Sequence, residues 1–362
     1  LKVPPDFTFI KDIVAGRPVL SHPLAKGGFR LRYGRSRFSG YSGQSINPTS
    51  MYVMKNYIAT GTQLKVERPG KGAAFTPCDR IEGPIIKIKD GSVIRLEDND
   101  QTKQYIKEIE EVLFLGDVLI NYGDFFDRAH ALVPAGYCEE WWIQELEKSV
   151  VNLFGAFDTE KLSDLIKLDK EFLDALFINP IKTKINAKDA INISKKLEIP
   201  LHPYYTYHWD DISLEDFKIL YNWLVKGNFK VEDELIKIIL KLEPEPKKIL
   251  ENIGLPHLVI NNEFVVIEKN HAQALNETLG EFKKELIENQ SILKMINLIS
   301  NIKIRDKSGT YIGARMGRPE KAKMRKMNGS PHSLFPVGEE GGRLRSFQSA
   351  LEIWKIKSDF PK

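Results

Sequence analysis

The chain has 362 residues, 42% of them hydrophobic and 28% charged, an ordinary globular composition with room for two or three domains. No apolar run reaches the roughly 18 residues of a membrane span, and no signal-peptide pattern is present. Cys78 and Cys138 are too few for a disulfide framework and lack metal-site spacing, so we expect a reducing compartment. Because the first residue is Leu1 and not Met, we expect an internal part of a longer polypeptide.

The net charge of +4 is distributed unevenly along the chain. Residues 139–252 carry 16 Lys and Arg against 22 Asp and Glu, whereas the rest of the chain carries 37 against 27. An acidic block between two basic flanks indicates that the flanks face a polyanion such as a nucleic acid.

The first part of the chain predicts a lead-in followed by a β-rich region. Residues 1–24 are rich in proline, and we expect them to be irregular. Residues 85–96 alternate between apolar and polar side chains on either side of Asp90-Gly91, which predicts a hairpin with a type I′ turn. Residues 112–121 predict a second strand pair, interrupted by Gly116-Asp117.

Helical periodicity begins near Glu139. Apolar residues recur at helical spacing in residues 162–177. Ser213 and Asp216 predict a capping box at the start of a further helix. We expect another helix over residues 232–242, ended by the prolines that follow it. Together these patterns predict an acidic, mainly helical insertion.

Strand character returns after this insertion. Residues 258–267 predict a hairpin around Asn261-Asn262, and residues 271–288 predict a helix. Residues 302–305 and 311–312 then predict strands that lead into a basic segment. We therefore predict an α+β fold in which the insertion divides a β-domain. The expected parts are a lead-in at 1–24, β-structure at 25–138, the insertion at 139–252, further β-structure at 253–330 and a connector at 331–362.

The densest cluster of charge is at residues 315–326, which we call the basic tract. It holds one acid and six cations, namely Arg315, Arg318, Lys321, Lys323, Arg325 and Lys326. Such a density of positive charge needs an anionic partner, and phosphate is the natural candidate. If the residues after Pro319 are helical, Lys323 and Lys326 share a face and could bind a triphosphate or a backbone phosphate. Composition alone leaves open a solvated basic surface or an RNA-binding patch.

A second basic cluster lies near the N-terminus. Residues 26–37 hold no acid and five cations, namely Lys26, Arg30, Arg32, Arg35 and Arg37. Arg30 and Arg32 alternate with apolar residues as on a strand, which predicts a ribbon with one basic face that suits a nucleic-acid backbone. The alternative is a charged outer face of a sheet, which is common.

Other polar residues carry weaker indications. Asp117, Asp124 and Asp127 could be metal ligands, but Gly-Asp steps favour turns in which the aspartate caps backbone amides. The seven histidines form no His-x₃-His pair, so we expect no zinc site. Only His332 has a suggestive position, because it follows the basic tract.

Four segments, in the same order, resemble the large subunit of the archaeal family D DNA polymerase. They are residues 27–37, 115–125, 132–142 and 314–326, and residues 334–343 fit the same family. The resemblance implies a double-psi β-barrel that contributes lysines and faces a second barrel bearing metal-binding aspartates. We therefore expect the divided β-domain of this chain to be the lysine barrel.

The resemblance also implies roles for individual residues. Lys323 and Lys326 are the implied catalytic lysines, with Lys321 as a further candidate. Nucleotide or DNA contacts are implied for Arg315, Arg318, Lys321, Arg325, Arg30, Arg32, Arg35 and Arg37. Nucleotidyl transfer needs Mg²⁺. The chain holds no Asp-Phe-Asp-Gly-Asp type loop, so we expect the Mg²⁺ ligands outside it. The resemblance also implies zinc, but only in later parts of the subunit.

The implied function is template-dependent DNA synthesis by a replicative DNA polymerase. This chain would be one part of that polymerase and would be inactive when it is alone. The implied partners are template–primer DNA, dNTPs, the rest of the large subunit with its aspartate barrel, a small exonuclease subunit and a sliding clamp. The implied setting is the archaeal cytoplasm and nucleoid, with no membrane, and the insertion would face away from DNA. A second hypothesis is a non-catalytic nucleic-acid-binding scaffold, in which the basic tract contacts only backbone phosphates.

Overall fold

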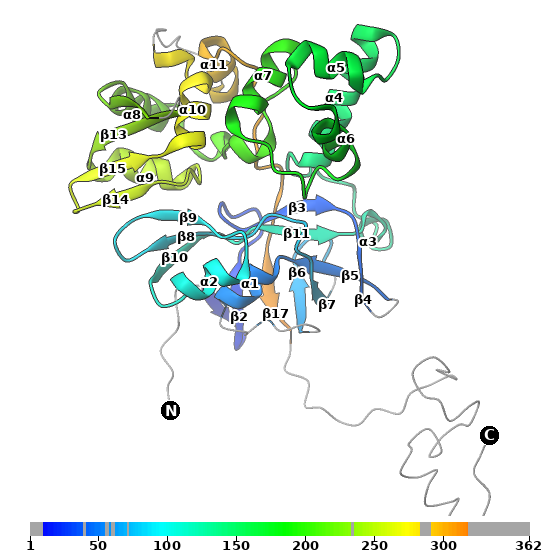
Figure 1. The fold of residues 1–362 in the computed structure, drawn as a ribbon. Helices are drawn as coiled ribbons and strands as arrows, with labels where there is room; N and C mark the ends of the chain where they lie inside the picture. The colour runs from blue at the N-terminus through cyan, green and yellow to red at the C-terminus, as the bar shows by residue number, and fades with distance from the viewer. Residues whose placement is uncertain are drawn as a thin grey trace, which may run out of the picture. The chain divides into compact units, whose positions relative to one another are not determined.

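The computed structural model describes most of the chain between Ile10 and Gly317 (Figure 1). The described residues are 10–38, 41–54, 58, 62–70, 72–232, 235–282 and 291–317. They form a mixed α+β structure, which confirms that part of the predicted fold. The basic tract from Arg318 onward and the expected connector at 331–362 lie outside these residues. None of the helices in the described ranges is long and apolar enough to cross a membrane.

Two stretches that are far apart in the sequence build one ten-stranded sheet. Nine strands follow the order β1-β2-β17-β6-β7-β5-β11-β3-β16, and β4 pairs with β5. The strands are β1 (Asp12–Val14), β2 (Arg17–Ser21), β3 (Phe29–Tyr33), β4 (Ser36–Phe38), β5 (Tyr41–Ile46), β6 (Gln63–Val66), β7 (Gly72–Pro77), β11 (Asp117–Ile120), β16 (Tyr311–Ile312) and β17 (Ala314–Met316). The pairs β3–β11 and β5–β7 are parallel. The residues between β11 and β16 therefore divide the sheet in sequence, while the expected boundaries of the insertion and the double-psi barrel stay predictions.

Part of the expected irregular lead-in is a β-hairpin. β1 and β2 pair antiparallel, and β2 continues the sheet by pairing with β17. Val19 and Leu20 are buried, so this segment contributes to the core. The prediction of an irregular lead-in is therefore wrong for residues 12–21. The high proline content suggested irregular structure, but a strand tolerates proline beside the edge of a sheet. Pro18 lies within β2 and stands opposite Ile13 of β1, the strand at the edge.

The hairpin expected at 85–96 is confirmed as β8 (Ile85–Ile88) and β9 (Val93–Arg95), which join β10 (Ile109–Phe114) in a three-stranded sheet. Its turn differs from the expected one. The N–H of Gly91 donates to the carbonyl of Ile88 at 2.8 Å, and Gly91 has φ +88°. The two central residues of the turn are therefore Lys89 and Asp90, and the type I′ turn over Asp90-Gly91 is wrong.

The two strands expected at 112–121 exist but do not pair with each other. β10 belongs to the three-stranded sheet, and β11 lies between β5 and β3 in the ten-stranded sheet. Gly116 connects them at φ +86°. A Cβ at Gly116 would lie 2.6 Å from the carbonyl oxygen of Glu82, so this crossing between sheets needs glycine.

Short helices lie beside the sheets. They are α1 (Pro48–Val53), α2 (Asn99–Tyr105) and α3 (Tyr122–Phe126). Each begins at an Asn or Asp whose side chain accepts a hydrogen bond from a backbone N–H of the first turn, and these caps are Asn47, Asp98 and Asn121. Apolar side chains from these helices and the sheets share one core, which includes Leu20, Phe29, Leu31, Ile46, Phe75, Ile86, Val118 and Phe125.

After α3 the chain forms a second region with its own hydrophobic core, which we call the helical region (Figure 1). Its helices are α4 (Glu139–Phe154), α5 (Thr159–Ile166), α6 (Lys170–Ile178), α7 (Ala187–Leu197), α8 (Leu214–Val225), α9 (Pro244–Asn252), α10 (Lys269–Thr278) and α11 (Ile292–Ile299). The helices expected at 162–177 are confirmed as α5 and α6. The capping box before α8 is also confirmed, with reciprocal bonds between Ser213 and Asp216.

The helix expected at 232–242 is wrong. This segment contains β13 (Leu235–Lys241), which pairs with β12 (Asn228–Glu232). Its three isoleucines favour a strand, because β-branched side chains pack well on a pleated surface. Pro244 does not end a helix but stands at the first position of α9, where its missing N–H costs nothing.

The hairpin expected at 258–267 is confirmed as β14 (Leu258–Ile260) and β15 (Phe264–Ile267). It does not join the ten-stranded sheet, because β15 pairs with β13 in a four-stranded sheet of order β12-β13-β15-β14. This sheet packs in the core of the helical region. The expected helix at 271–288 is α10 as far as Thr278, and residues 283–290 lie outside the description. The strand expected at 302–305 is wrong, since only Lys303 forms a bridge, to Pro200.

The capping box at α8 gives a test of the helical region. We expect Ser213→Ala to lower the free energy of unfolding by about 1 kcal/mol, because the N–H of Asp216 loses its acceptor. Ser213→Asp should retain nearly all of the stability, since aspartate also caps helices. Urea unfolding of the three proteins measures both effects. Equal stability of Ser213→Ala and wild type would contradict the assigned cap.

Candidate functional site

The centre of the described structure is a buried group of charged residues on β3 and β11. Arg30 and Arg32 lie two residues apart on β3, and Asp117 of the parallel strand β11 stands opposite Arg30. Arg30 binds this carboxylate in a fork, with Nε 2.6 Å from Oδ1 and Nη2 2.9 Å from Oδ2. Arg32 Nη1 and the N–H of Glu82 also donate to Oδ2, at 3.3 and 3.2 Å. The fully buried Asp117 carboxylate is therefore saturated with donors.

Glu82 and Lys307 extend this group. Glu82 Oε2 lies 2.9 Å from Lys307 Nζ and 3.4 Å from Arg30 Nη2, and Glu82 Oε1 lies 3.5 Å from Arg95 Nε. Burial opposes ionisation of Glu82, but Lys307, Arg95 and Arg30 hold the pKa of its carboxyl well below the usual range. Burial lowers the pKa of Lys307 to about 8. We call the buried ion network the set of Arg30, Arg32, Glu82, Arg95, Asp117 and Lys307.

The buried ion network joins the sheet to the helical region. Arg30 Nη1 donates to the carbonyls of Tyr137 and Lys307, each at 3.2 Å. Tyr137 precedes α4 and Lys307 follows α11, so one guanidinium holds both chain connections of the helical region. Arg32 Nη2 lies 3.2 Å from Oε2 of Glu139, which is in the first turn of α4.

These contacts correct the expected basic outer face of β3. Arg30 is 4% exposed and Arg32 is 5% exposed. Burial alone would lower the pKa of each guanidinium, but the neighbouring carboxylates outweigh it and raise both pKa values. Their charges are neutralised inside the chain, so neither is a surface cation for a DNA backbone. The partners Glu82, Asp117 and Glu139 are distant in sequence, which is why local charge counting missed them.

Some of the other expected site residues lie in the described part of the chain, and the rest lie outside it. Arg35 is exposed in the loop after β3, and Arg37 lies in β4 with a side chain that is outside the description. Arg315 lies in β17, with Nε 3.4 Å from Glu67 Oε1. The residues that lie outside the described part are Arg318, Lys321, Lys323, Arg325, Lys326 and His332, and their roles stay predictions.

Asp127 is exposed, whereas three other aspartates have structural partners. Asp124 Oδ2 lies 3.4 Å from the donor Nε2 of Gln44. Asp98-Asn99-Asp100 is an Asp-x-Asp sequence, but Asp98 caps α2 and Asp100 pairs with Lys103 at 2.8 Å. Within the described ranges, no group of three His, Cys, Asp or Glu side chains could hold a metal ion.

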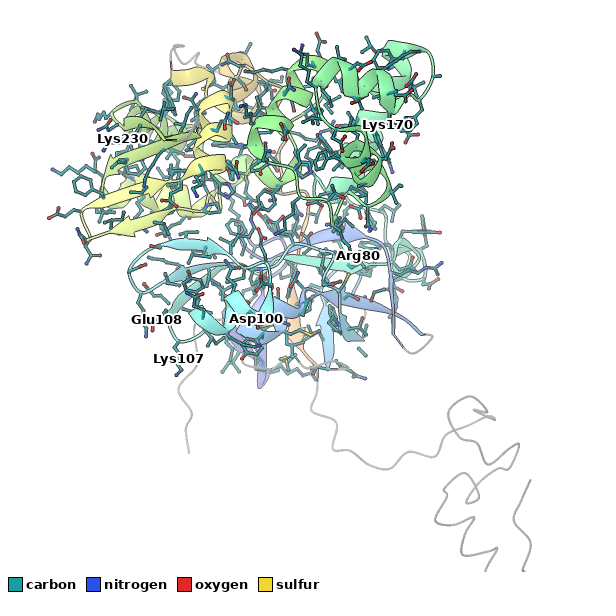
Figure 2. All side chains as sticks on the ribbon, in the orientation of Figure 1. Arg80, Asp100, Lys107, Glu108, Lys170 and Lys230 are labelled. Carbon is teal, nitrogen blue, oxygen red and sulfur yellow. The ribbon has the colours of Figure 1, made fainter. Side chains whose placement is uncertain are left out.

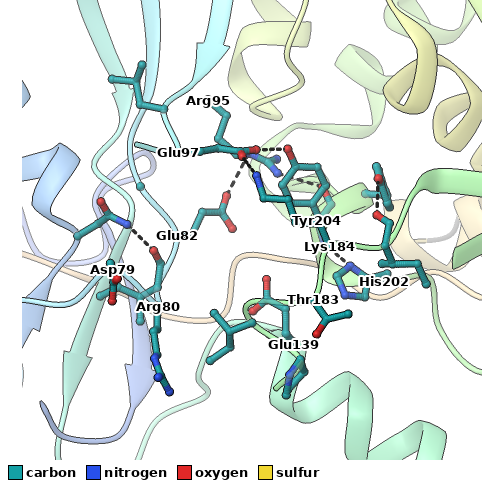
Figure 3. A pocket seen from close by; sticks show the side chains of 18 of the residues that line it. Asp79, Arg80, Glu82, Arg95, Glu97, Glu139, Thr183, Lys184, His202 and Tyr204 are labelled. Carbon is teal, nitrogen blue, oxygen red and sulfur yellow. Dashed lines mark hydrogen bonds and ion pairs between the residues drawn. The ribbon is translucent and has the colours of Figure 1, made fainter. Parts of the chain in front are cut away.

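A cavity of about 420 Å³ opens beside the buried ion network, between the three-stranded sheet and the helical region (Figure 3). Arg95 Nη1 crosses this boundary and donates to the carbonyl of Tyr204 at 3.0 Å. The hydroxyl of Tyr204 and the ammonium of Lys184 both bind Glu97. The wall of the cavity includes the cations Arg32, Arg80, Arg95 and Lys184, the carboxylates Asp79, Glu82, Glu97 and Glu139, and also His202 and Tyr204. Cations and carboxylates are balanced in this wall, so it does not define one class of ligand.

His202 is a neutral imidazole at the back of this cavity. Its Nδ1 accepts a hydrogen bond from the N–H of Tyr204 at 3.2 Å, and the ring is 4% exposed. Burial lowers the pKa of His202 to about 4, although the nearby Glu139 opposes this shift. The helical region therefore keeps an uncharged histidine close to several ion pairs.

Sequence reasoning missed Glu82, Arg95 and Lys307. Arg95 follows the alternation of the predicted hairpin, so its side chain could have been placed on the face of Val93, but nothing in the sequence named its partner. Lys307 lies in a turn whose Gly309, at φ +63°, passes so close to Ala135 that a Cβ would be 2.4 Å away. Only the three-dimensional contacts reveal this group.

The comparison with protein families identifies the chain. The family model "DNA polymerase II large subunit DP2, central domain" matches residues 1–360, so the chain belongs to this family. Similar proteins are named DNA polymerase II large subunit in Pyrococcus horikoshii, Archaeoglobus fulgidus and Methanothermobacter thermautotrophicus, at 41%, 42% and 41% identity over 98%, 98% and 97% of this chain. The chain spans only 26%, 29% and 30% of these relatives. The resemblance stated from the sequence is confirmed.

Removal of the central carboxylate should destabilise the fold strongly. We expect Asp117→Ala to lower the free energy of unfolding by about 3–5 kcal/mol, because two buried guanidinium groups lose their shared partner. Asp100→Ala, on the exposed surface of α2 (Figure 2), is the matched control and should change the stability very little, because an exposed ion pair is screened by solvent. Urea unfolding compares the two. A similar small loss for both variants would contradict the central role of Asp117.

The neutral His202 should make stability depend on pH. Its pKa is about 4 in the folded chain against an ordinary 6.5, so unfolding takes up a proton between these values. The free energy of unfolding should therefore fall as the pH is lowered from 6.5 to 4. In His202→Gln the slope over this window should decrease by up to about 1.4 kcal/mol per pH unit. Urea unfolding at a series of pH values measures it, and an unchanged slope would contradict the assignment.

Proposed function

We propose that this chain supplies the lysine-bearing part of the active site of a DNA polymerase that carries out template-dependent nucleotidyl transfer. The observation that carries the proposal is the position of the basic tract in a member of the large-subunit family. β17 ends at Met316, and the tract continues from Arg318. β17 lies between β2 and β6 and pairs with both, so the start of the tract is fixed to the sheet from two sides.

The chemistry explains why lysines are useful at such a place. In nucleotidyl transfer the primer 3′-oxygen attacks the α-phosphorus of a dNTP, and pyrophosphate leaves. Negative charge increases on the phosphate oxygens, and fixed cations that meet this charge lower the barrier. We propose that Lys323 and Lys326 supply such cations, with Lys321 as a further candidate.

Mg²⁺ would activate the 3′-oxygen and neutralise the leaving pyrophosphate. The buried carboxylates Asp117 and Glu82 do not suit it, because Asp117 is saturated by arginines and Glu82 is held by Lys307, Arg30 and Arg95. We therefore propose that the Mg²⁺ ligands come from the aspartate barrel elsewhere in the large subunit. The chain would then be inactive when it is alone, and any zinc would belong to later parts of the subunit.

The burial of Arg30 and Arg32 changes the proposed DNA contacts. We assign these two arginines to holding the sheet together and not to DNA. The cations proposed to contact the template–primer backbone are Arg35, Arg37, Arg315, Arg318 and Arg325. The proposed partners remain DNA, dNTPs, the rest of the large subunit, the small exonuclease subunit and the sliding clamp.

Substitution of the catalytic lysine tests this function. In the complete polymerase, we expect Lys323→Ala to reduce the single-turnover rate of incorporation at saturating DNA and dNTP by about 100-fold or more. Lys170→Ala, an exposed lysine on α6 (Figure 2), is the matched control and should retain the wild-type rate. If Lys323→Ala kept a rate within about threefold of wild type, the catalytic assignment of Lys323 would be contradicted. If DNA affinity fell while that rate were kept, the non-catalytic scaffold would be supported.

A further inference from the structure

We propose that α3 and the loop after it form a stacking surface for unpaired bases of a single-stranded nucleic acid, namely the template strand. We call it the α3 surface, made of the exposed Tyr122, Phe126, Arg128, His130 and Leu132. The proposal rests on the proposed polymerase function, since the strand it names is the template of that reaction.

The backbone of the ten-stranded sheet places this surface next to an exposed arginine. The parallel strands β3 and β11 end side by side, with Ile120 opposite Tyr33. The N–H of Gly34 also donates to the carbonyl of Ile120 at 3.0 Å. Arg35 follows one strand and Tyr122 follows the other, so both lie at the same edge of the sheet, where Figure 1 places α3.

Two aromatic rings are presented to solvent on α3. Tyr122 and Phe126 are 60% and 61% exposed. They are four residues apart on the helix, with ring centroids 6.3 Å apart and an interplanar angle of 81°. Each ring would contribute considerable stability if it were buried, so two neighbouring exposed rings indicate a surface that is covered by a ligand.

The rings stand on a rigid base. Phe125, between them in sequence, is fully buried and meets the ring of Tyr33 at a centroid distance of 5.6 Å. The Tyr33 hydroxyl donates to the carbonyl of Val133 at 2.8 Å and accepts from its N–H at 2.9 Å. The N–H of His130 donates to the carbonyl of Phe125 at 2.8 Å. The helix and the following loop are thus held in place before a ligand arrives, which reduces the entropy lost on binding.

The charges around the rings suit a nucleic-acid strand. Arg128 and His130 are exposed in the loop after α3, and Arg35 is exposed across the edge of the sheet. Asp127 is an exposed carboxylate in the same loop, whereas Asp124 is partly buried and near Gln44. Flat aromatic faces beside guanidinium groups bind single strands with little sequence preference, because every base has a π-face and every linkage has a phosphate.

Other exposed apolar side chains of the chain have a different character. Leu153, Phe157 and Ile178 of the helical region are 55%, 47% and 82% exposed. This part of the chain has no arginine at all between residues 139 and 252. Two of these three side chains are aliphatic and offer no flat ring for a base. The combination of adjacent exposed rings and arginines thus distinguishes the α3 surface from this group, and Ile178 provides a control position.

The test uses the complete polymerase with primer–template DNA that carries 2-aminopurine in a template overhang of about ten nucleotides. Tyr122→Leu/Phe126→Leu keeps the apolar bulk but removes the flat rings. We expect this double variant to lose stacking-dependent quenching of the 2-aminopurine and to bind the long overhang about tenfold more weakly. Affinity for a template with a one-nucleotide overhang should change much less. Ile178→Ala should behave as wild type on both DNAs.

Two results would overturn the proposal. One is unchanged quenching and long-overhang affinity in the double leucine variant, and the other is an equal loss of affinity for both DNAs. Tyr122→Ala/Phe126→Ala separates a protein interface from a DNA surface. If only the alanine variant fails to assemble with the rest of the polymerase, while the leucine variant binds DNA normally, the surface is a protein interface. The Lys323→Ala rate is measured on the same DNAs, so failure of the catalytic proposal is seen independently.

Discussion

The bidentate pair between Arg30 and Asp117 is the interaction on which the described structure depends. It joins the parallel strands β3 and β11, and the same guanidinium holds the carbonyls of Tyr137 and Lys307 on either side of the helical region. Removing such charges from water is costly, and only nearly complete pairing offsets that cost. The network therefore requires the sheet, the Glu82 loop and the helical region to be in place together.

This requirement links the network to the proposed active site. The chain leaves the helical region at Lys307 and then forms β16 and β17, which complete the sheet before the basic tract begins. Because Lys307 is fixed by Glu82 and Arg30, the path of the chain into β17 is determined by buried charges. The arginines of β3 serve this purpose, so the cations proposed to meet phosphate are those of the tract and of the loop at Arg35.

Local signals in the sequence identify several elements whose structure is decided by neighbouring residues, although they do not give the type of the turn before Gly91. The capping box at Ser213 and the hairpin at Asn261-Asn262, with φ of 53° and 54°, depend on adjacent residues and were predicted correctly. The helix predicted at residues 232–242 is wrong because the spacing of the apolar residues outweighed the β-branched side chains of β13, which pairs with β12 and with β15. The sequence places Arg30 on a basic face because local charge counting does not find its partner Asp117, which is 87 residues away. For the basic tract, charge density and helical spacing indicate only a phosphate partner, and the catalytic role of Lys323 and Lys326 comes from the family resemblance.

The central claim is that the basic tract meets the triphosphate of the incoming nucleotide. An acyl-phosphate derivative of a dNTP transfers its acyl group to a lysine next to the terminal phosphate. The deprotonated amine attacks the acyl carbon, an amide forms, the bond between the acyl carbon and the phosphate oxygen breaks, and the dNTP is released. The complete polymerase, bound to primer–template DNA, would be labelled and its peptides analysed by mass spectrometry. We expect acylation of Lys321, Lys323 or Lys326, and we expect an excess of unmodified dNTP to prevent it. Protected acylation elsewhere in the polymerase, with the tract unlabelled, would contradict the account.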